Sequence, residues 1–210
     1  MHHRQPSRFA GAPNRLGQKF AAERPNQLWL TDITYGQTEE GLLYLAAVLD
    51  LFTRKIVGWA MRDHLRADRT IAALAMAIKR QKLPQGLIHH SDRGSQYAAA
   101  SYRKLPTAAG MIQSMSRKGN CLRQCTDGKP PRHPKTERVH QACHKTRDAA
   151  RHGLFAYIEG YYNRRRLRSA LGHITPGQAG RQAAYPVSTK SREGQSCALV
   201  GEVGLEPTKA

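Results

Sequence analysis

The sequence WLTDITY, residues 29–35, is a β-rich run that places one aspartate, Asp32, where hydrophobic residues give way to polar ones. A second stretch, HSDRGSQY at residues 90–97, follows the apolar pair Leu87–Ile88 and places Asp92 in a similar position. Two carboxylates that converge from neighbouring strands can hold a divalent metal ion against a phosphate. Taken singly, each aspartate is better explained structurally, with Asp32 paired to an arginine and Asp92 capping a turn with Gly94. Only the pair predicts a metal site.

The order of the elements around these stretches indicates the fold class. Three β-rich runs with short turns lie between residues 28 and 61 and predict an antiparallel meander. A helix is expected over 67–82, with Asp68 available to cap it, then a strand at 87–90, a helix at 98–109 and a strand at 111–115. A strand that follows a helix after a meander implies a parallel crossover. The expected fold is an α/β ribonuclease-H-like fold, with a five-stranded mixed sheet flanked by helices.

Composition changes divide the chain into three parts. Residues 1–24 are polar and basic and are expected to form an N-terminal arm. Residues 25–182 are expected to form the core, which includes a C-terminal helix within 136–166 whose apolar face contains Leu154, Tyr157 and Ile158. Periodicity is lost beyond Pro176, and 183–210 is expected to be a disordered tail of low hydrophobicity.

The charge of the chain indicates a polyanionic partner. Lys and Arg total 34 against 15 Asp and Glu, a formal net charge of +19. Nucleic acid is favoured over a membrane surface or an acidic protein, because basic side chains laid on phosphates release counterions. No apolar run approaches the ~20 residues of a membrane helix, and no signal peptide opens the chain, so we expect a cytoplasmic protein.

The cysteines give no disulfide framework and suit a reducing compartment. A zinc site can be assembled on paper, but its spacing matches no tight knuckle, and zinc is disfavoured. The residues concerned are Cys121, Cys125, His133, His140, Cys143 and His144.

Several motifs, agreeing in order over roughly residues 14–182, resemble the integrase-type catalytic core of bacterial insertion-sequence transposases, specifically the second reading frame of the IS-three family. They are PNQLWLTDITY (25–35), VLDLFTR (48–54), HSDRGSQY (90–97), SMSRKGNC (114–121), YYNRRR (161–166), SALG (169–172) and Thr175–Pro176. The resemblance implies a ribonuclease-H-like fold, an Asp-Asp-Glu triad, two Mg²⁺ (or Mn²⁺) ions and transfer of a 3′-hydroxyl into DNA.

Residue by residue, the resemblance makes Asp32 and Asp92 the first two catalytic metal ligands. Phosphate contacts are expected from the basic residues Lys118, Arg164, Arg165 and Arg166. The implied partners are the DNA ends of the element, target DNA, and a second copy of the chain or an intact transposase. The implied location is the bacterial cytoplasm, at the nucleoid.

The third carboxylate is missing, because the family's glutamate falls where this chain has Gly128. Here the chain reads LRQCTDGK over 122–129, where the family reads approximately YDNAPMES. Synonymous codons for the former, CTA CGA CAA TGC ACC GAT GGA AAG with a following C, read from the second base as TAC GAC AAT GCA CCG ATG GAA AGC. Those codons spell YDNAPMES in full. We infer that residues 122–134 are translated out of frame, between an extra base near Cys121 and a lost base near Pro134.

This inference has three consequences. Cys125 and His133 become products of the shifted frame, which removes the main support for zinc. Pro130, Pro131 and Pro134 exclude the helix that carries the family's glutamate, so an irregular loop is expected there. The copy is expected to be catalytically defective, with Mg²⁺ binding impaired. The alternative function is a non-enzymatic DNA-binding fragment that interferes with an intact transposase. Arg168, His173 and the segment after Val200 also depart from the family pattern.

We predict that the chain binds DNA with little dependence on sequence and with a steep dependence on salt. The reason is the net charge of +19, because each phosphate contact releases a condensed counterion. Fluorescence anisotropy of labelled duplexes across a salt series should give an affinity that falls log-linearly. A flat response would show that the charge has another role.

Overall fold

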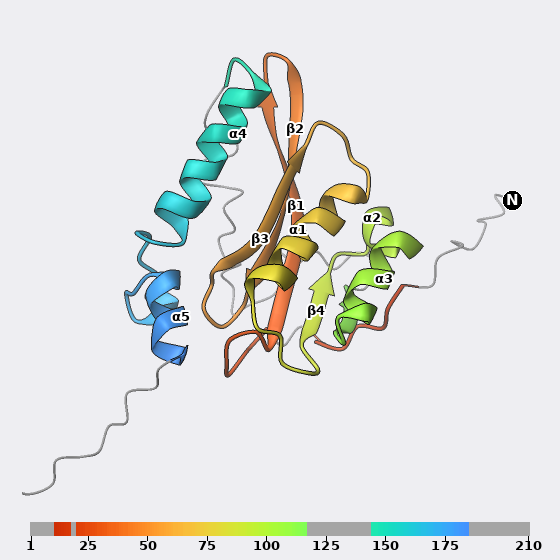
Figure 1. Ribbon diagram of the computed structural model, residues 1–210, viewed down its shortest axis with the longest axis vertical. Helices are drawn as coiled ribbons and strands as arrows, with labels where there is room; N and C mark the ends of the chain where they lie inside the picture. Colours follow the sequence, from red (N-terminus) through yellow and green to blue (C-terminus); the bar gives the residue numbers. More distant parts are fainter. Residues whose placement is uncertain (1–10, 18–19, 117–143, 185–210) are drawn as a thin grey trace, which may run out of the picture.

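The computed structural model describes residues 11–17, 20–116 and 144–184. At its centre lies a five-stranded sheet in the order β3-β2-β1-β4-β5 (Figure 1). The β1–β2 and β2–β3 pairs are antiparallel, whereas β1–β4 and β4–β5 are parallel. The strands are β1 (Leu28–Thr38), β2 (Gly41–Asp50), β3 (Ile56–Arg62), β4 (Ile88–Ser91) and β5 (Ile112–Met115). The predicted mixed sheet of a ribonuclease-H-like fold is confirmed.

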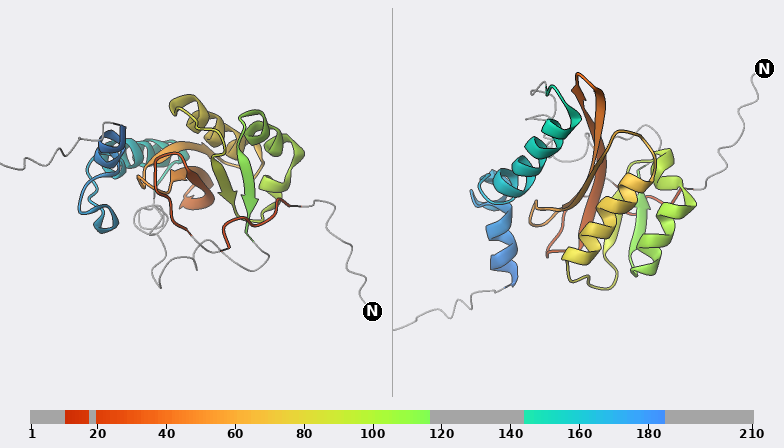
Figure 2. Two further views of the ribbon diagram at one scale, coloured as in Figure 1. Left: turned by 90° about the horizontal axis from the view of Figure 1, so that it is seen from below. Right: turned by 45° about the horizontal axis from the view of Figure 1, so that its top comes forward.

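Helices pack against both faces of this sheet (Figure 2). One face carries α1 (Asp68–Arg80), the single-turn α2 (Ser95–Ala98) and α3 (Ala100–Ala108). The other carries α4 (Arg147–Phe155), which continues as the π-helical segment η3 (Ala156–Tyr162). The chain then forms the short 3₁₀ turn η4 (Ser169–Leu171) and α5 (Pro176–Ala184). No helix among the described residues is long and apolar enough to cross a membrane.

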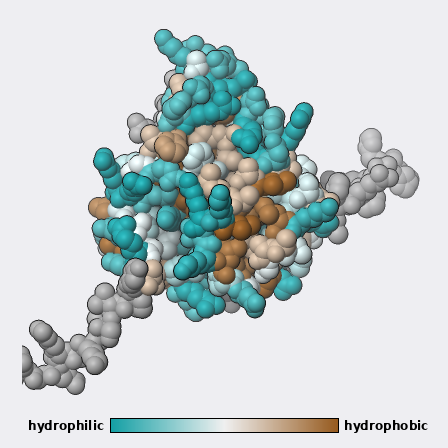
Figure 3. Space-filling view, in the orientation of Figure 1, coloured by the Kyte–Doolittle hydropathy of each residue, from teal (hydrophilic) through white to brown (hydrophobic). Residues whose placement is uncertain are grey.

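Alternation along the central strands divides the core into two clusters. Leu28 and Leu30 of β1 belong to the cluster that contains Leu154 and Ile158. Trp29, between them, belongs to the opposite cluster, which contains residues of α1 and α3. Successive side chains of a strand point to opposite faces, so one apolar run supplies both layers. Figure 3 shows hydrophilic residues over the upper part of the molecule, where α4 and the β1–β2 hairpin lie.

Residues at the start of the described chain pack on the sheet. Leu16 is buried in the same cluster as Leu28, and Phe20 packs against that cluster. The backbone N–H of Arg15 donates to Ser114 Oγ at 3.0 Å. These residues lie within the expected basic arm, where two isolated apolar residues among charges show no periodicity. Their hydrophobic contacts depend on the sheet being formed first.

One helix was not foreseen from the sequence, and one local expectation was wrong. Residues after Pro176 form α5, which begins with a capping box: Thr175 N–H donates to Gln178 Oε1 at 2.8 Å and Gln178 N–H donates to Thr175 Oγ1 at 3.2 Å. The helix was missed because it is only nine residues long. Asp68 does not cap α1, whose N-cap is Ala67 and has no side-chain cap. Asp68 instead lies near Arg62 and His64.

One asparagine joins η3 to the edge of the sheet. Asn163 Oδ1 accepts from the Ile56 N–H at 2.9 Å, and Asn163 Nδ2 donates to the Ile56 carbonyl at 3.0 Å. The Asn163 carbonyl also accepts from the Gly177 N–H at 2.8 Å. The side chain of Asn163 therefore fixes the position of β3, and its backbone carbonyl fixes the start of α5.

Gly58 allows α1 to lie directly on β3. A Cβ at this position would be 2.2 Å from the Ala73 carbonyl oxygen and 2.7 Å from Ala77 Cβ. Both neighbours belong to the buried face of α1, whose backbone cannot move without moving the helix. The small residue is thus a requirement of the packing.

We predict that Gly58→Ala lowers the free energy of unfolding by about 3 kcal/mol, the upper end of the usual cost of overpacking. The matched control is Gly160→Ala, because a Cβ there meets nothing within 4 Å. Alanine at that exposed helical position should stabilise the protein by up to about 1 kcal/mol. Urea unfolding followed by circular dichroism measures both changes. Equal effects of the two substitutions would contradict the close approach at Gly58.

Candidate active site

Asp32 and Asp92 are carried by two strands that pair directly. In the parallel ladder between β1 and β4, Thr31 is opposite Ser91. Asp32 and Asp92 are the next residues along each strand, so the register, continued by one residue, sets them side by side. Because side chains alternate between the two faces along each strand, residues at matching positions of paired strands point to the same face of the sheet. We expected the two aspartates to come from neighbouring strands, and β1 and β4 are neighbours in the sheet.

The two aspartates differ in exposure. Asp32 lies mid-strand and is 7% exposed, and its Oδ1 accepts from the Ile33 N–H at 2.8 Å. Asp92 lies just beyond β4 and is half-buried. A site formed by the two would therefore have one wall in the sheet and one side open toward solvent, which is what a large substrate requires.

Tyr97 is buried in the cluster that also contains Trp29 and residues of α1 and α3. Its side chain is 3% exposed and packs edge-on against the Tyr102 ring, with 5.3 Å between the ring centroids. Burial raises the pKa of Tyr97 well above its usual value, and the charges of Tyr102, Asp32 and Asp92 raise it further, while Arg69 lowers it. Among the described residues no group accepts or donates a hydrogen bond at the Tyr97 hydroxyl. The hydroxyl is therefore buried and neutral, and the two aspartates act on it through their charges.

Buried polar contacts join β4 to its two neighbouring strands, β1 and β5. His89 Nε2 lies 2.6 Å from Thr31 Oγ1 and 3.1 Å from the Tyr102 hydroxyl. Burial lowers the pKa of His89 to about 3, with a smaller contribution from His90. On the neighbouring residue, His90 Nδ1 lies 2.9 Å from Ser114 Oγ, and burial lowers the pKa of His90 to about 4. Both imidazoles are neutral at physiological pH, so they act as hydrogen-bonding groups.

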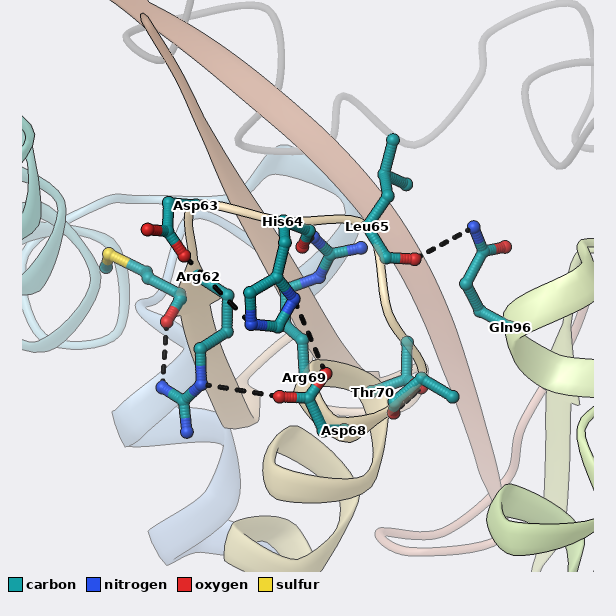
Figure 4. A network of polar contacts seen from close by, with 10 residues as sticks. Arg62, Asp63, His64, Leu65, Asp68, Arg69, Thr70 and Gln96 are labelled. Carbon is teal, nitrogen blue, oxygen red and sulfur yellow. Dashed lines mark hydrogen bonds and ion pairs between the residues drawn. The ribbon is translucent and has the colours of Figure 1, made fainter. Parts of the chain in front are cut away.

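A network at the start of α1 connects the β3–α1 loop to α2 (Figure 4). Gln96 Nε2 donates to the Leu65 carbonyl at 3.4 Å, and Arg69 Nη1 donates to the His64 carbonyl at 2.8 Å. Arg69 is fully buried, and its guanidinium lies 5.1 Å from the Tyr44 ring centroid. Burial lowers the pKa of Arg69, partly offset by Tyr97, Asp68 and Tyr44. The network positions α2, and with it Tyr97, against the sheet.

The described residues supply two ligands of the expected metal site. Carboxylate oxygens suit Mg²⁺ or Mn²⁺, and Asp32 and Asp92 satisfy that chemistry. No group of three or more His, Cys, Asp or Glu side chains that could hold a metal ion occurs within residues 11–17, 20–116 and 144–184. Gly128, the predicted irregular loop at 122–134, Lys118 and all but one of the residues named for zinc lie outside these ranges. The exception is His144, which is half-buried.

The predicted phosphate contacts at the end of η3 have different environments. Arg164 and Arg165 are exposed, whereas Arg166 is half-buried. Arg166 Nη1 donates to the Tyr157 hydroxyl at 3.1 Å, and its guanidinium lies 5.5 Å from the Tyr162 ring centroid. Arg166 therefore also contributes to packing, while Arg164 and Arg165 remain available to a partner.

Comparison with known proteins places the chain in a family. The model of the integrase core domain matches residues 22–121. A 31 kDa protein of insertion element IS600 from Shigella sonnei is 46% identical over 79% of this chain and 61% of its own length. The transposase of insertion sequence element IS904 from Lactococcus lactis is 37% identical over 83% of this chain and 69% of its own length. The chain belongs to the IS-three family of insertion-sequence transposases.

The fold comparison agrees with this assignment. The HTLV-2 integrase catalytic core domain in complex with magnesium, in its trimeric form, has a TM-score of 0.51 and 17% identity, over 76% of this chain and 99% of that chain. Such a likeness supports the shared ribonuclease-H-like fold of this transposase chain. The chain spans 61% of the length of the IS600 protein, less than two thirds.

Sequence reasoning missed the buried polar groups that hold β4 against β1. Tyr97 lies inside the HSDRGSQY motif, so its motif was recognised and its burial against Tyr102 was not. Thr31, His89 and Tyr102 come from three separate elements, and no spacing in the sequence connects them. Arg69 is a charged residue in an amphipathic helix, where exposure is the normal expectation.

We predict that His89 makes stability fall as the pH decreases. Its pKa is about 3 in the folded protein against an ordinary value of 6.5, so the unfolded chain binds the proton first. The contribution is intact above pH 6.5 and is lost toward pH 3, by up to about 1.4 kcal/mol per pH unit. Unfolding free energies measured from pH 7 to pH 4 should show a shallower slope for His89→Gln.

The control for this experiment is His152→Gln, because the His152 side chain is 78% exposed. That variant should keep the pH slope of the parent. If the His89 and His152 variants have the same slope as the parent, His89 is not held neutral in the folded state.

Proposed function

We propose that the chain is the catalytic core of a transposase that joins DNA by metal-dependent strand transfer, and that this copy is catalytically defective. The observation that carries the proposal is the pairing of β1 with β4, in which Thr31 is opposite Ser91. That register brings the strand positions of Asp32 and Asp92 together. Family membership and the charge of +19 support DNA as the substrate.

Asp32 and Asp92 would hold the metal ions through their carboxylate oxygens. Two divalent ions, when bound, activate the attacking oxygen and stabilise the leaving oxygen of an in-line displacement at phosphorus. Asp32 would contribute to holding both ions, because it is buried mid-strand and fixed by its contact with the Ile33 N–H. Asp92 would bind one of them. Magnesium is the metal named for the HTLV-2 integrase core that shares this fold.

Other residues of the chain would shape the site without entering the chemistry. Tyr97 is buried, packs on Tyr102 and would fix α2, which follows Asp92 in the chain, against the sheet. The neutral His89 holds β4 against β1 through Thr31. Arg164 and Arg165 are exposed and would contact DNA phosphates. Lys118, named for the same role, lies outside the described residues.

The defect follows from Gly128 at the position of the family's glutamate. A two-carboxylate site has lost one anionic ligand, and the three prolines at 130, 131 and 134 oppose the helix that would position a replacement. Catalytic groups need positioning within about 0.5 Å, so Asp127 in such a segment is no substitute. The inferred shift of reading frame over residues 122–134 accounts for both the missing glutamate and the prolines.

A second candidate function is DNA binding without catalysis, by a fragment that assembles with intact transposase and interferes with it. The specific observation in its favour is Gly128 at the position where the family has its glutamate. The basic character of the chain would be kept in such a fragment, since it does not depend on the missing glutamate.

We predict that the chain as written has no appreciable strand-transfer activity and that repair of the frame restores it. The repaired version restores the frame across the whole of residues 122–134, so that YDNAPMES replaces LRQCTDGK at 122–129 and the residues at 130–134 also come from the restored frame. The missing ligand removes several kcal/mol of transition-state stabilisation, which corresponds to a rate at least about a thousandfold lower. The measurement is a strand-transfer assay with an element end, target DNA and Mg²⁺.

Asp92→Ala, introduced into the repaired chain and into the unrepaired chain, provides two controls for this assay. Asp92→Ala in the repaired chain should abolish its activity, because one of the remaining metal ligands is lost. Activity of the unrepaired chain that survives Asp92→Ala indicates a contaminant. Activity of the unrepaired chain that disappears with Asp92→Ala would show that the missing glutamate is not required, and the proposed defect would be wrong.

A further inference from the structure

Three arginines from two distant parts of the chain gather around one buried tyrosine, Tyr162. The guanidinium of Arg168 lies 4.7 Å from the Tyr162 ring centroid, and that of Arg166 lies 5.5 Å from it. Arg54 comes from the turn between β2 and β3. The charges of all three arginines oppose the rise in the Tyr162 pKa that burial causes. The cluster therefore concentrates positive charge at one place on the surface.

This positive charge is not balanced by nearby carboxylates. Within the described residues no ion pair joins Arg54 or Arg168 to an aspartate or glutamate. Burial lowers the pKa of Arg54, and the repulsion from Arg168 lowers it further. Asp50 is the acidic residue that acts on Arg54, but both of its oxygens already accept hydrogen bonds from Asn26 and Thr53. Mutual repulsion of this kind favours a bound anion.

Local structure holds both arginines in place. Arg54 has a positive φ of 59° and follows the turn that Asp50 closes through Thr53. Arg168 forms an isolated bridge with Ile174, whose carbonyl accepts from the Arg168 N–H at 3.0 Å. Its Nε is buried and has no hydrogen-bond partner among the described residues. A guanidinium that is already fixed loses less entropy when it binds a ligand.

A hollow of about 560 Å³ lies next to the cluster. Arg54, Ala170, Leu171 and Ile174 are among the residues that line it. Ala170 and Leu171 follow Arg168 closely in the sequence, and Ile174 pairs with Arg168 through the backbone. In Figure 1 the β2–β3 turn lies beside α5, which closes the hollow with Ala179. The volume is ample for a phosphate group and part of a sugar. The exposed Arg164 and Arg165 extend the positive surface beyond it.

We propose that Arg54 and Arg168 form a phosphate-binding site that takes a backbone phosphate of DNA through their guanidinium groups. Arginine suits this role because its planar fork matches a phosphate with two parallel hydrogen bonds. The site is separate from Asp32 and Asp92, and it adds two residues to the DNA contacts that the sequence indicated. It rests on the proposed function in so far as DNA is the source of the phosphate.

The test measures the salt dependence of duplex binding by the full chain. Each phosphate contact contributes about 0.9 to the slope of log affinity against log salt. The variant with Arg54→Gln and Arg168→Gln should lose up to twice that slope and bind DNA about tenfold more weakly near 0.1 M salt. Arg151→Gln removes one positive charge, half of what the double variant removes, from an exposed position on α4, and it should leave the slope of the parent unchanged.

The outcomes separate this inference from the proposed function. A parent chain that binds no DNA contradicts both. A parent that binds with a steep slope, together with a double variant of the same slope, overturns the Arg54–Arg168 site alone. Equal losses in the double variant and in Arg151→Gln also overturn it, because they indicate a diffuse charge effect.

Inorganic phosphate distinguishes the source of the anion. At matched ionic strength, phosphate should raise the unfolding temperature of the parent above that in chloride, and the double variant should lose this increase. If phosphate stabilises the parent while the DNA slope of the double variant is unchanged, the site takes free phosphate and the DNA contact is overturned.

A charge-conserving variant covers the case in which glutamine at 168 prevents folding. Arg54→Lys with Arg168→Lys keeps both charges and the cationic contact with Tyr162, but it loses the planar forks. The folded lysine variant should bind DNA several-fold more weakly than the parent at equal salt. Unchanged affinity would overturn the proposal that the guanidinium groups bind the phosphate.

Discussion

The parallel pairing of β1 with β4 is the contact on which the rest of this structure depends. It joins the antiparallel meander to the second half of the sheet, and it brings Asp32 to the position beside Asp92. A parallel pair needs a long crossover, here through α1, so the pairing costs more chain entropy than the hairpins do. The contact between Thr31 and His89 lies inside this ladder. A neutral, buried histidine can hold the strands together where a charged one would separate them.

Close packing on the two faces of the sheet converts this pairing into a rigid scaffold. Gly58 lets α1 rest on β3, and Asn163 fixes the end of η3 to Ile56 by two hydrogen bonds. The same asparagine receives a bond from Gly177, so the C-terminal segment with Arg168 is tied to the sheet edge. The basic surface is therefore placed by the core. Its charges can be held near one another because backbone contacts fix the residues that carry them.

The proposed site combines a favourable position with an incomplete set of ligands. The register of β1 and β4 sets the strand positions of Asp32 and Asp92 side by side, whereas the described residues contain no group of three potential metal ligands. The contacts that hold the sheet, α1 and α4 together are made among described residues, so loss of a carboxylate at position 128 would remove chemistry and leave these contacts in place. The excess of basic residues is likewise independent of that carboxylate. On the function proposed above, the chain would keep its shape and its charge while lacking catalytic power.

The sequence by itself indicated the antiparallel meander, the parallel crossover, the mixed sheet, the two candidate aspartates and the family, because these depend on local patterns and on motifs that occur in order. It is also the basis of the proposed loss of the third carboxylate, since that is a matter of residue identity at Gly128. Tertiary structure alone decided the burial of Leu16, the contact of His89 with Thr31 and the two hydrogen bonds between Asn163 and Ile56. Each of these joins residues far apart in the chain, and no local period encodes such contacts. Only the folded sheet, with its fixed register and close-packed helices, brings them together.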